Sequence, residues 1–202
     1  TAVARHLEAR GKPKGSISFL ITGDEEGPAV NGTIKLLKAI EADGETLSHC
    51  LVGEPTSEQT LGDVIKNGRR GSLNAKVVVT GKQGHVAYPD KAANPVPALL
   101  KFLHKLENWH LDDGAPGFQP TNLEITSVDV GNAAHNVIAA RAEAKFNIRF
   151  NTNHTGQELK DEITRLAVES TTAGCEIDLE LNVTGESFYT QPSDFTSMIV
   201  DA

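Results

Sequence analysis

Residues 140–150 alternate strictly between two kinds of side chain. One set is apolar, namely Ala140, Ala142, Ala144, Phe146, Ile148 and Phe150, and the other is polar or charged, namely Arg141, Glu143, Lys145, Asn147 and Arg149. Successive side chains of a β-strand point to opposite faces of its sheet, so this pattern predicts a strand with one covered and one solvated face. Such strands are typical of antiparallel sheets, which limits the folds that this part of the chain can adopt.

Similar patterns surround this strand. Alternation at 72–80, at 122–130 and at 177–183 predicts three more strands, and apolar residues at helical spacing predict helices over 95–106 and 159–167. The resulting order is β-α-β-β-α-β, which is the ferredoxin-like arrangement of an α+β domain. Both helices are expected to cover one face of the sheet. We therefore predict a complete inserted domain at residues 71–184.

The sequence on either side of this domain has a different character. Short apolar runs at 16–22 and 49–53 predict buried strands, and helical patterns lie before and between them, at 2–10 and around 34–40. This alternation predicts a partial α/β layer at residues 1–70, to which residues 185–202 begin to return. The glycine-containing segments 68–71 and 184–185 are expected to be hinges between the two parts.

Composition excludes several classes of function. The chain has 19 Lys and Arg against 27 Asp and Glu, and the resulting net charge of −8 argues against a nucleic-acid binder. No apolar run approaches the roughly 18–20 residues that cross a bilayer. The two cysteines, Cys50 and Cys175, are expected to be free thiols in the cytoplasm. The only methionine is Met198, so we interpret the chain as an internal piece of a longer protein.

Acidic residues follow both predicted strands of the first part. Asp24, Glu25 and Glu26 come after the first strand, and Glu54 comes after the second. Ligands of open α/β sheets bind beyond the carboxyl ends of the strands, so these carboxylates are candidate metal ligands or a base for a metal-bound water. The alternative is that residues 24–26 complement the dipole of the following helix and that Glu54 is an ordinary loop residue.

Two further sets of residues are candidates for polar chemistry. His85 lies in a glycine-rich loop, where it is either a donor to an oxyanion or a surface histidine. Arg69, Arg70 and Arg149 are candidate clamps for carboxylates, although Arg149 equally fits the polar face of its strand.

Five motifs in this order resemble the M20 metallopeptidase family. They are Thr-Gly-Asp-Glu-Glu-Gly-Pro at 22–28, Val-Gly-Glu-Pro-Thr at 52–56, Asn-Gly-Arg-Arg-Gly-Ser at 67–72, Gly-His-Val-Ala-Tyr-Pro at 84–89 with Ala-Asn-Pro at 93–95, and Asn-Val-Ile at 136–138. The resemblance implies a dinuclear zinc amidohydrolase, with cobalt as an alternative metal, that forms a homodimer through the inserted domain. It also implies the removal of succinate from N-succinyl-L,L-2,6-diaminopimelate in lysine biosynthesis.

The same resemblance implies a role for each matching residue. Glu25 corresponds to the general base, and Glu26 and Glu54 correspond to one ligand of each zinc ion. His85 corresponds to a histidine that stabilises the oxyanion in the partner subunit's active site. The remaining matches are substrate contacts: Tyr88 and Asn136, which act in the partner's site, and Arg69 and Arg149, which hold carboxylates.

Two other interpretations stay open at this point. The parent protein is alternatively another M20 deacylase, such as an acetylornithine deacetylase or an aminoacylase, and the chain itself is alternatively a non-catalytic dimerisation module. The family's His-x-Asp motif and a further zinc-binding histidine have no match between Thr1 and Ala202. We therefore expect the chain alone to be inactive and to bind zinc weakly or not at all.

Overall fold

The computed structural model describes residues 2–23, 27 and 29–202 of the chain. It divides into two compact units, Thr1–Glu54 and Pro55–Ala202. Each unit is described by itself below. Glu25 and Glu26, the predicted base and one predicted metal ligand, lie outside the described residues.

The described part of the first unit contains two helices. Helix α1 covers Ala2–Arg10 and helix α2 covers Thr33–Ala42. Gly11 and Gly44 both follow a helix and both have a φ of 76°, a left-handed conformation in which glycine ends helices without steric cost. The two helices predicted for this part of the sequence are therefore confirmed.

The two strands predicted for the first unit are not formed. Residues 16–22 and 49–53 have no regular secondary structure, and the described residues before Gly68 contain no strand. Their apolar side chains are exposed: Phe19 by 67%, Ile21 by 89% and Leu51 by 71%. A buried strand needs hydrogen-bonded neighbouring strands, and the described part of this unit supplies none. The strands predicted at 16–22 and 49–53 are therefore wrong for the described residues, and the α/β layer stays a prediction.

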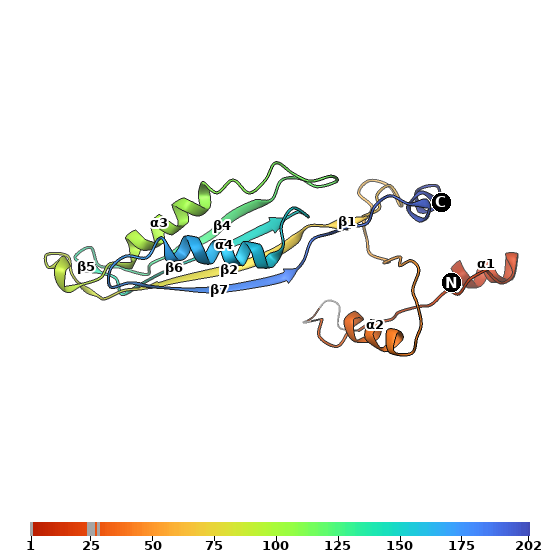
Figure 1. Cartoon of the computed structure of the whole chain (residues 1–202), viewed down its shortest axis with the longest axis horizontal. Helices are drawn as coiled ribbons and strands as arrows, with labels where there is room; N and C mark the ends of the chain where they lie inside the picture. The colour runs from red at the N-terminus through yellow and green to blue at the C-terminus, as the bar shows by residue number, and fades with distance from the viewer. Residues whose placement is uncertain (1, 24–26, 28) are drawn as a thin grey trace. The chain divides into compact units, whose positions relative to one another are not determined.

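The second unit is built on a four-stranded antiparallel sheet (Figure 1). Its strands are β2 (Gly71–Thr80), β4 (Asn122–Asp129), β6 (Arg141–Phe150) and β7 (Glu176–Gly185). They lie side by side in the order β4-β6-β2-β7. Helices α3 (Pro95–Glu107) and α4 (Gly156–Val168) follow β2 and β6 in the chain and cover the same face of the sheet (Figure 1). All six elements occur in the predicted order.

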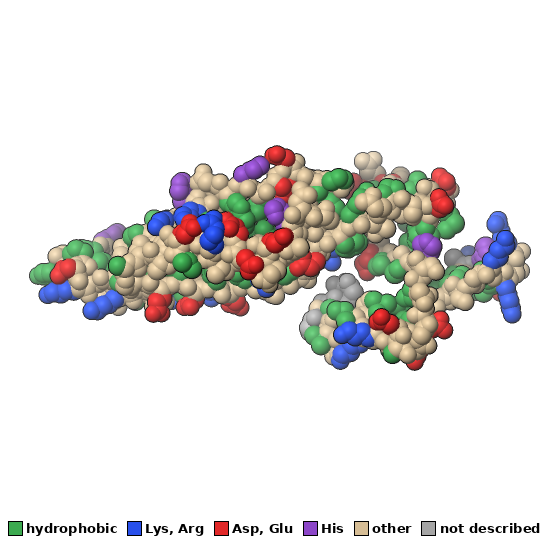
Figure 2. Space-filling view, in the orientation of Figure 1, with side chains coloured by type: hydrophobic (Ala, Val, Ile, Leu, Met, Phe, Trp, Pro, Cys, Tyr) green, Lys and Arg blue, Asp and Glu red, His purple; other side chains and the backbone are tan. Residues whose placement is uncertain are grey.

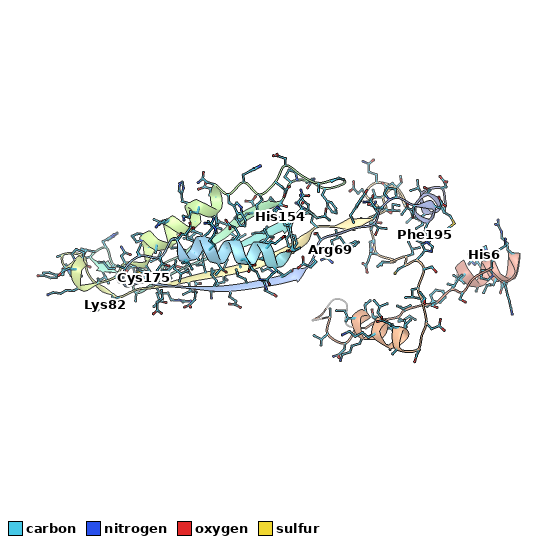
Figure 3. The ribbon with its side chains drawn as sticks, in the orientation of Figure 1. His6, Arg69, Lys82, His154, Cys175 and Phe195 are labelled. Carbon is cyan, nitrogen blue, oxygen red and sulfur yellow. The ribbon has the colours of Figure 1, made fainter. Side chains whose placement is uncertain are left out.

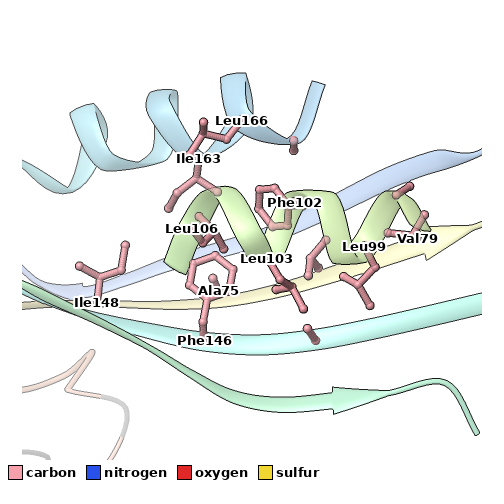
Figure 4. Packing of buried hydrophobic residues seen from close by; sticks show 14 of the residues in the cluster. Ala75, Val79, Leu99, Phe102, Leu103, Leu106, Phe146, Ile148, Ile163 and Leu166 are labelled. Carbon is pink, nitrogen blue, oxygen red and sulfur yellow. The ribbon is translucent and has the colours of Figure 1, made fainter. Parts of the chain in front are cut away.

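The core lies between the helices and the two central strands (Figure 4). Leu73, Val77 and Val79 of β2 and Ile148 of β6 are fully buried. Phe102 of α3 is also fully buried, and its ring meets Phe146 of β6 edge to face at 6.2 Å. The alternation in the sequence thus reports the covered face of the sheet, because every second side chain points toward the helices.

Side chains stabilise the N-termini of both helices. The Asn94 carboxamide accepts a hydrogen bond from the Val96 amide, and Pro95 occupies the first turn of α3. At α4 the Thr155 hydroxyl accepts from the Glu158 amide while the Glu158 carboxylate accepts from the Thr155 amide. This reciprocal arrangement satisfies amides that the helix itself leaves without partners.

Two short ribbons extend from opposite ends of the sheet. Strand β1 (Gly68–Arg69) pairs with β8 (Phe188–Tyr189), and strand β3 (Gly84–His85) pairs with β5 (Val137–Ile138). A short 3-10 helix, η1 (Pro89–Lys91), follows β3, and helix α5 (Asp194–Val200) follows β8. Of the two segments predicted as hinges, 68–71 contains β1, which is paired with β8, and 184–185 is the end of β7.

Three further features concern the length of the helices, the surface charge and the cysteines. Among the residues described, no helix is both long and apolar enough to cross a bilayer. Acidic and basic side chains are interspersed over the face of the second unit seen in Figure 2, without a continuous basic surface on that face. Both cysteines are free, Cys50 exposed and Cys175 buried.

Candidate functional site

Three of the predicted site residues come together on the β3–β5 ribbon, which we call the tip. His85 pairs with Val137 in this ribbon, and the neighbouring Asn136 carbonyl accepts a hydrogen bond from the Val86 amide at 3.1 Å. The Tyr88 amide donates to the His85 carbonyl at 2.9 Å, and the rings of His85 and Tyr88 lie 6.1 Å apart. His85, Tyr88 and Asn136 are all exposed, so their side chains are available to a molecule outside this unit.

The glycines of the tip are needed because the chain folds back on itself there. A Cβ at Gly81 would lie 2.1 Å from the Ala93 carbonyl oxygen, and one at Gly84 would lie 2.7 Å from the Ala92 Cβ. Real Cβ atoms do not approach other atoms so closely, so no larger residue fits either position without moving the backbone. These two glycines therefore allow a close approach of the backbone, and the approaching segment is 92–93 of the same chain.

A hydrogen bond orients the imidazole of His85. Its Nδ1 accepts from the Ala87 amide at 3.1 Å, which in the neutral ring leaves the proton on Nε2. The Nε2–H is therefore the group that remains to donate. Beside it, the Lys91 ammonium lies 5.0 Å from the centre of the Tyr88 ring, a distance at which a cation is attracted to the aromatic face.

The predicted arginine clamps lie at the other end of the sheet. Arg69 belongs to β1, while Arg149 lies near the end of β6 in register with Ser72 and Asn122. Among the described residues neither Arg69 nor Arg149 forms an ion pair, and both are exposed. Arg70 instead donates to the Asn122 side-chain oxygen at 2.8 Å, so this guanidinium already has a structural partner.

The tip and the arginines are separated by the length of β2. Figure 3 shows Lys82 near the tip at one end of the domain and Arg69 at the other. Strand β2 has 10 residues. At about 3.3 Å per residue it spans roughly 30 Å. One copy of this domain therefore cannot bring His85 and Arg149 to the same small molecule.

The predicted metal ligands are not assembled in the described residues. Glu54 is exposed and lies in an irregular segment of the first unit, while Glu26 is outside the described residues. No group of three or more His, Cys, Asp or Glu side chains suited to a metal ion occurs in the part of the chain that the structure describes.

The structure also contains a polar cluster around Asp112 that the sequence motifs did not predict. Asp112 accepts hydrogen bonds from the Gly114 amide at 2.6 Å and the Asn151 carboxamide at 2.7 Å, and its other oxygen lies 2.9 Å from Nε2 of His154. Asn151 is fully buried. The pKa of the Asp112 carboxyl is lowered well below its ordinary value, because hydrogen bonds from Thr121, Asn151 and Gly114 outweigh the opposing effect of burial.

His154 belongs to this cluster, although a histidine in a polar stretch of sequence is by default a solvated surface residue. Only 19% of its side chain is exposed, and its imidazole contacts Asp112. The sequence signal available was indirect: Ala-Pro-Gly-Phe at 115–118 indicates a tight turn, but not what the turn contacts.

Comparison with known proteins identifies the family. The model of the M20 peptidase dimerisation domain matches residues 67–173. A protein of Maricaulis maris named succinyl-diaminopimelate desuccinylase is 56% identical over 201 residues, covering 99% of this chain and 51% of the relative. A protein of Phenylobacterium zucineum with the same name is 50% identical over 202 residues, covering 100% of this chain and 53% of the relative.

Solved structures extend the comparison to the fold. A putative aminohydrolase from methicillin-resistant Staphylococcus aureus superposes with a TM-score of 0.55 at 26% identity, covering 67% of this chain and 36% of that one. This chain spans about half the length of the curated relatives that it matches. The match to the dimerisation domain over more than half of its residues shows that the chain belongs to the M20 peptidase family.

Proposed function

We propose that this chain is part of a homodimeric M20 amide hydrolase that removes succinate from N-succinyl-L,L-2,6-diaminopimelate, in lysine and diaminopimelate biosynthesis in the cytoplasm. The names of relatives at 50–56% identity support this substrate. We further propose that residues 71–184 form the dimerisation domain and that its fold is ferredoxin-like. The strand order β4-β6-β2-β7 and the two helices on one face support that assignment.

The observation that carries the proposal is the separation of the tip from the arginines. If His85 and Arg149 both act on one substrate, they must come from different copies of the chain. A two-fold dimer satisfies this requirement, since each tip is then available to the partner's site. The exposure of His85, Tyr88 and Asn136 supports the same arrangement.

Each group has a distinct part in the proposed reaction. The Nε2–H of His85 donates to the oxygen of the succinyl carbonyl as negative charge develops on it, and this stabilises the tetrahedral intermediate. Arg69 and Arg149 hold carboxylates of the substrate, because a guanidinium pairs with a carboxylate through two parallel hydrogen bonds. Tyr88 and Asn136 contact the substrate beside His85. Glu25 is the proposed general base.

The described residues do not by themselves fit a metal ion. Glu54 offers one carboxylate, whereas a zinc ion usually has four ligands. The two zinc ions, or cobalt in their place, therefore remain a proposal that needs Glu26 and ligands beyond the described residues. When bound, such ions lower the pKa of a water molecule and make it a nucleophile at neutral pH.

The substrate is tested with the full-length protein. We expect hydrolysis of N-succinyl-L,L-2,6-diaminopimelate and little hydrolysis of N-acetylornithine. The reverse preference would assign the protein to another M20 deacylase. Absence of both activities in a metal-loaded dimer would favour a non-catalytic dimerisation module.

The role of His85 is tested by substitution. His85→Ala should lower kcat by roughly 10²–10³, as the loss of an oxyanion donor does in other hydrolases, with a much smaller change in KM. His110→Ala is the matched control, because that imidazole is 74% exposed and its ion-pair partner, Asp113, is exposed as well. An unchanged kcat for His85→Ala would remove this residue from the mechanism.

Mixing two inactive variants tests whether the tip acts on the partner. Subunits carrying His85→Ala are combined with subunits carrying Glu25→Gln, and the subunits are allowed to exchange. We expect about one quarter of the wild-type activity to return, because half of the dimers are mixed and each mixed dimer has one intact site. If His85 acts within its own subunit, every site lacks one group and no activity returns.

A further inference from the structure

The β1–β8 ribbon connects the four-stranded sheet to the chain segments that precede β1 and follow β8. Each of its strands has two residues, with Gly68 opposite Tyr189 and Arg69 opposite Phe188. Two more hydrogen bonds extend it by one pair: the Thr190 amide donates to the Asn67 carbonyl at 2.7 Å, and the Asn67 carboxamide donates to the Thr190 carbonyl at 3.2 Å. A two-stranded ribbon of this length is only marginally stable without support.

An aromatic side chain from a distant loop supports the ribbon. The ring of Phe118 meets the ring of Tyr189 edge to face, with centroids 5.8 Å apart and planes at 72°. A Cβ at Gly68 would lie 2.9 Å from Cζ of Phe118, so the ring occupies the space that the glycine leaves. The turn at 115–118 brings Phe118 there, and Gly117 adopts a φ of 80° within it.

The loop that carries Phe118 is held in place by the Asp112 cluster. Asn151, which is fully buried, donates to Asp112 and to the Gln119 carbonyl. The backbone carbonyl of Asn151 accepts a hydrogen bond from the Ser187 hydroxyl at 3.1 Å. The segment that follows β7 is thus held at two residues. Ser187 is hydrogen-bonded to Asn151 of the cluster, and Tyr189 packs against Phe118.

We propose that Phe118 is a positioning residue of the enzyme: it fixes the direction in which the ribbon leaves the sheet and thereby sets where the tip of the domain falls. This step rests on the proposed function for its catalytic consequence. Strand β2 acts as a lever between the ribbon and His85. With an arm of roughly 30 Å, a change of about 10° at the ribbon moves the tip by roughly 5 Å.

Such a displacement matters because hydrogen-bond catalysis tolerates little error. A misplacement of about 1 Å can cost on the order of 10²-fold in rate. Phe118 does not contact the substrate in this scheme. Its removal widens the range of positions that His85 samples, which lowers the fraction of dimers with a complete site.

The test uses the full-length protein with Phe118→Ala and the control Phe188→Ala. Phe188 belongs to the same ribbon, but its side chain is 53% exposed, so its removal leaves the support intact. We expect Phe118→Ala to speed hydrogen exchange of the Thr190 amide by roughly 2- to 10-fold, as the loss of one aromatic pair implies, without changing exchange in β2 or β6. Phe188→Ala should leave exchange at Thr190 unchanged.

Kinetics then separate positioning from a structural role. Phe118→Ala should lower kcat by roughly tenfold with KM within about twofold, and Phe118→Leu should recover most of the rate because an apolar side chain again fills the space over Gly68. If hydrogen exchange of the Thr190 amide is unchanged in Phe118→Ala, then Phe118 does not stabilise the ribbon and the proposal is overturned. Faster exchange with an unchanged kcat overturns the positioning role. If the wild type hydrolyses no succinyl amide, the proposed function fails, and the exchange measurement still decides whether Phe118 holds the ribbon.

Discussion

Gly71 offers the sharpest test of how this domain is packed. It stands opposite Phe150 in the register of β2 and β6. A Cβ at Gly71 would lie 2.2 Å from Cζ of Phe150 and 2.3 Å from Cε2. Phe150 is fully buried. To restore a normal contact of 3.4 Å, the ring tip would have to retreat by about 1.2 Å into a packed core.

We therefore expect Gly71→Ala to destabilise the domain. Forcing extra atoms into a packed core costs about 1–3 kcal/mol, and the direct overlap with a buried ring places this variant near the upper value. Gly185→Ala is the matched control, since Gly185 lies next to the same end of the sheet and a Cβ there meets nothing within 4 Å. The control should be neutral or more stable by about 0.4–1 kcal/mol, because alanine reduces the entropy of the unfolded chain.

Urea unfolding followed by tryptophan fluorescence measures the effect. The single tryptophan, Trp109, packs against the core of this domain, so its signal reports on the domain itself. The double variant with Phe150→Leu should recover at least about 1 kcal/mol relative to additivity, because the shorter side chain leaves room for the new methyl group. If Gly71→Ala unfolds at the same urea concentration as wild type or Gly185→Ala, the steric argument is refuted.

Two further perturbations test the Asp112 cluster and the core. Asp112→Asn should cost about 1–3 kcal/mol at pH 7 by weakening hydrogen bonds to a charged acceptor. Because the folded-state pKa of Asp112 lies below its ordinary value of 3.8, its stabilisation is present above that pH and is lost as the pH falls through the folded pKa. Urea unfolding at pH 7, 4 and 3 should therefore show that the difference in free energy of unfolding between wild type and variant shrinks as the pH falls. A constant difference would contradict this. Phe102→Ala should cost about 3–5 kcal/mol in the same assay, whereas Leu100→Ala on the exposed side of α3 should cost under about 0.5 kcal/mol; equal costs would contradict the assigned core.

The elements of the second unit were predictable because their patterns are local and strong. The alternation at 140–150 matches β6, and the capped apolar repeats match α3 and α4. The apolar runs at 16–22 and 49–53 were misread for the opposite reason. Such a run carries no information about whether neighbouring strands are present to pair with it, and the described first unit contains none.

The candidate site was only partly predictable. His85, Tyr88 and Asn136 were named from motifs, and the structure brings them to one ribbon. Their separation from Arg69 and Arg149 was not visible in the motifs, because spacing along the chain does not say which ends of a sheet two loops occupy. The roles of these residues stay predictions.

The sequence by itself determined the family, the order of strands and helices in the second unit, and the identity of its buried face. These follow from periodicity and motifs, which are properties of neighbouring residues. Tertiary structure alone decided that Asn151 is buried against Asp112 and that Phe118 rests on Tyr189 over Gly68. Such contacts join residues 39 to 71 positions apart along the chain, and their partners are chosen by packing, which no local pattern encodes.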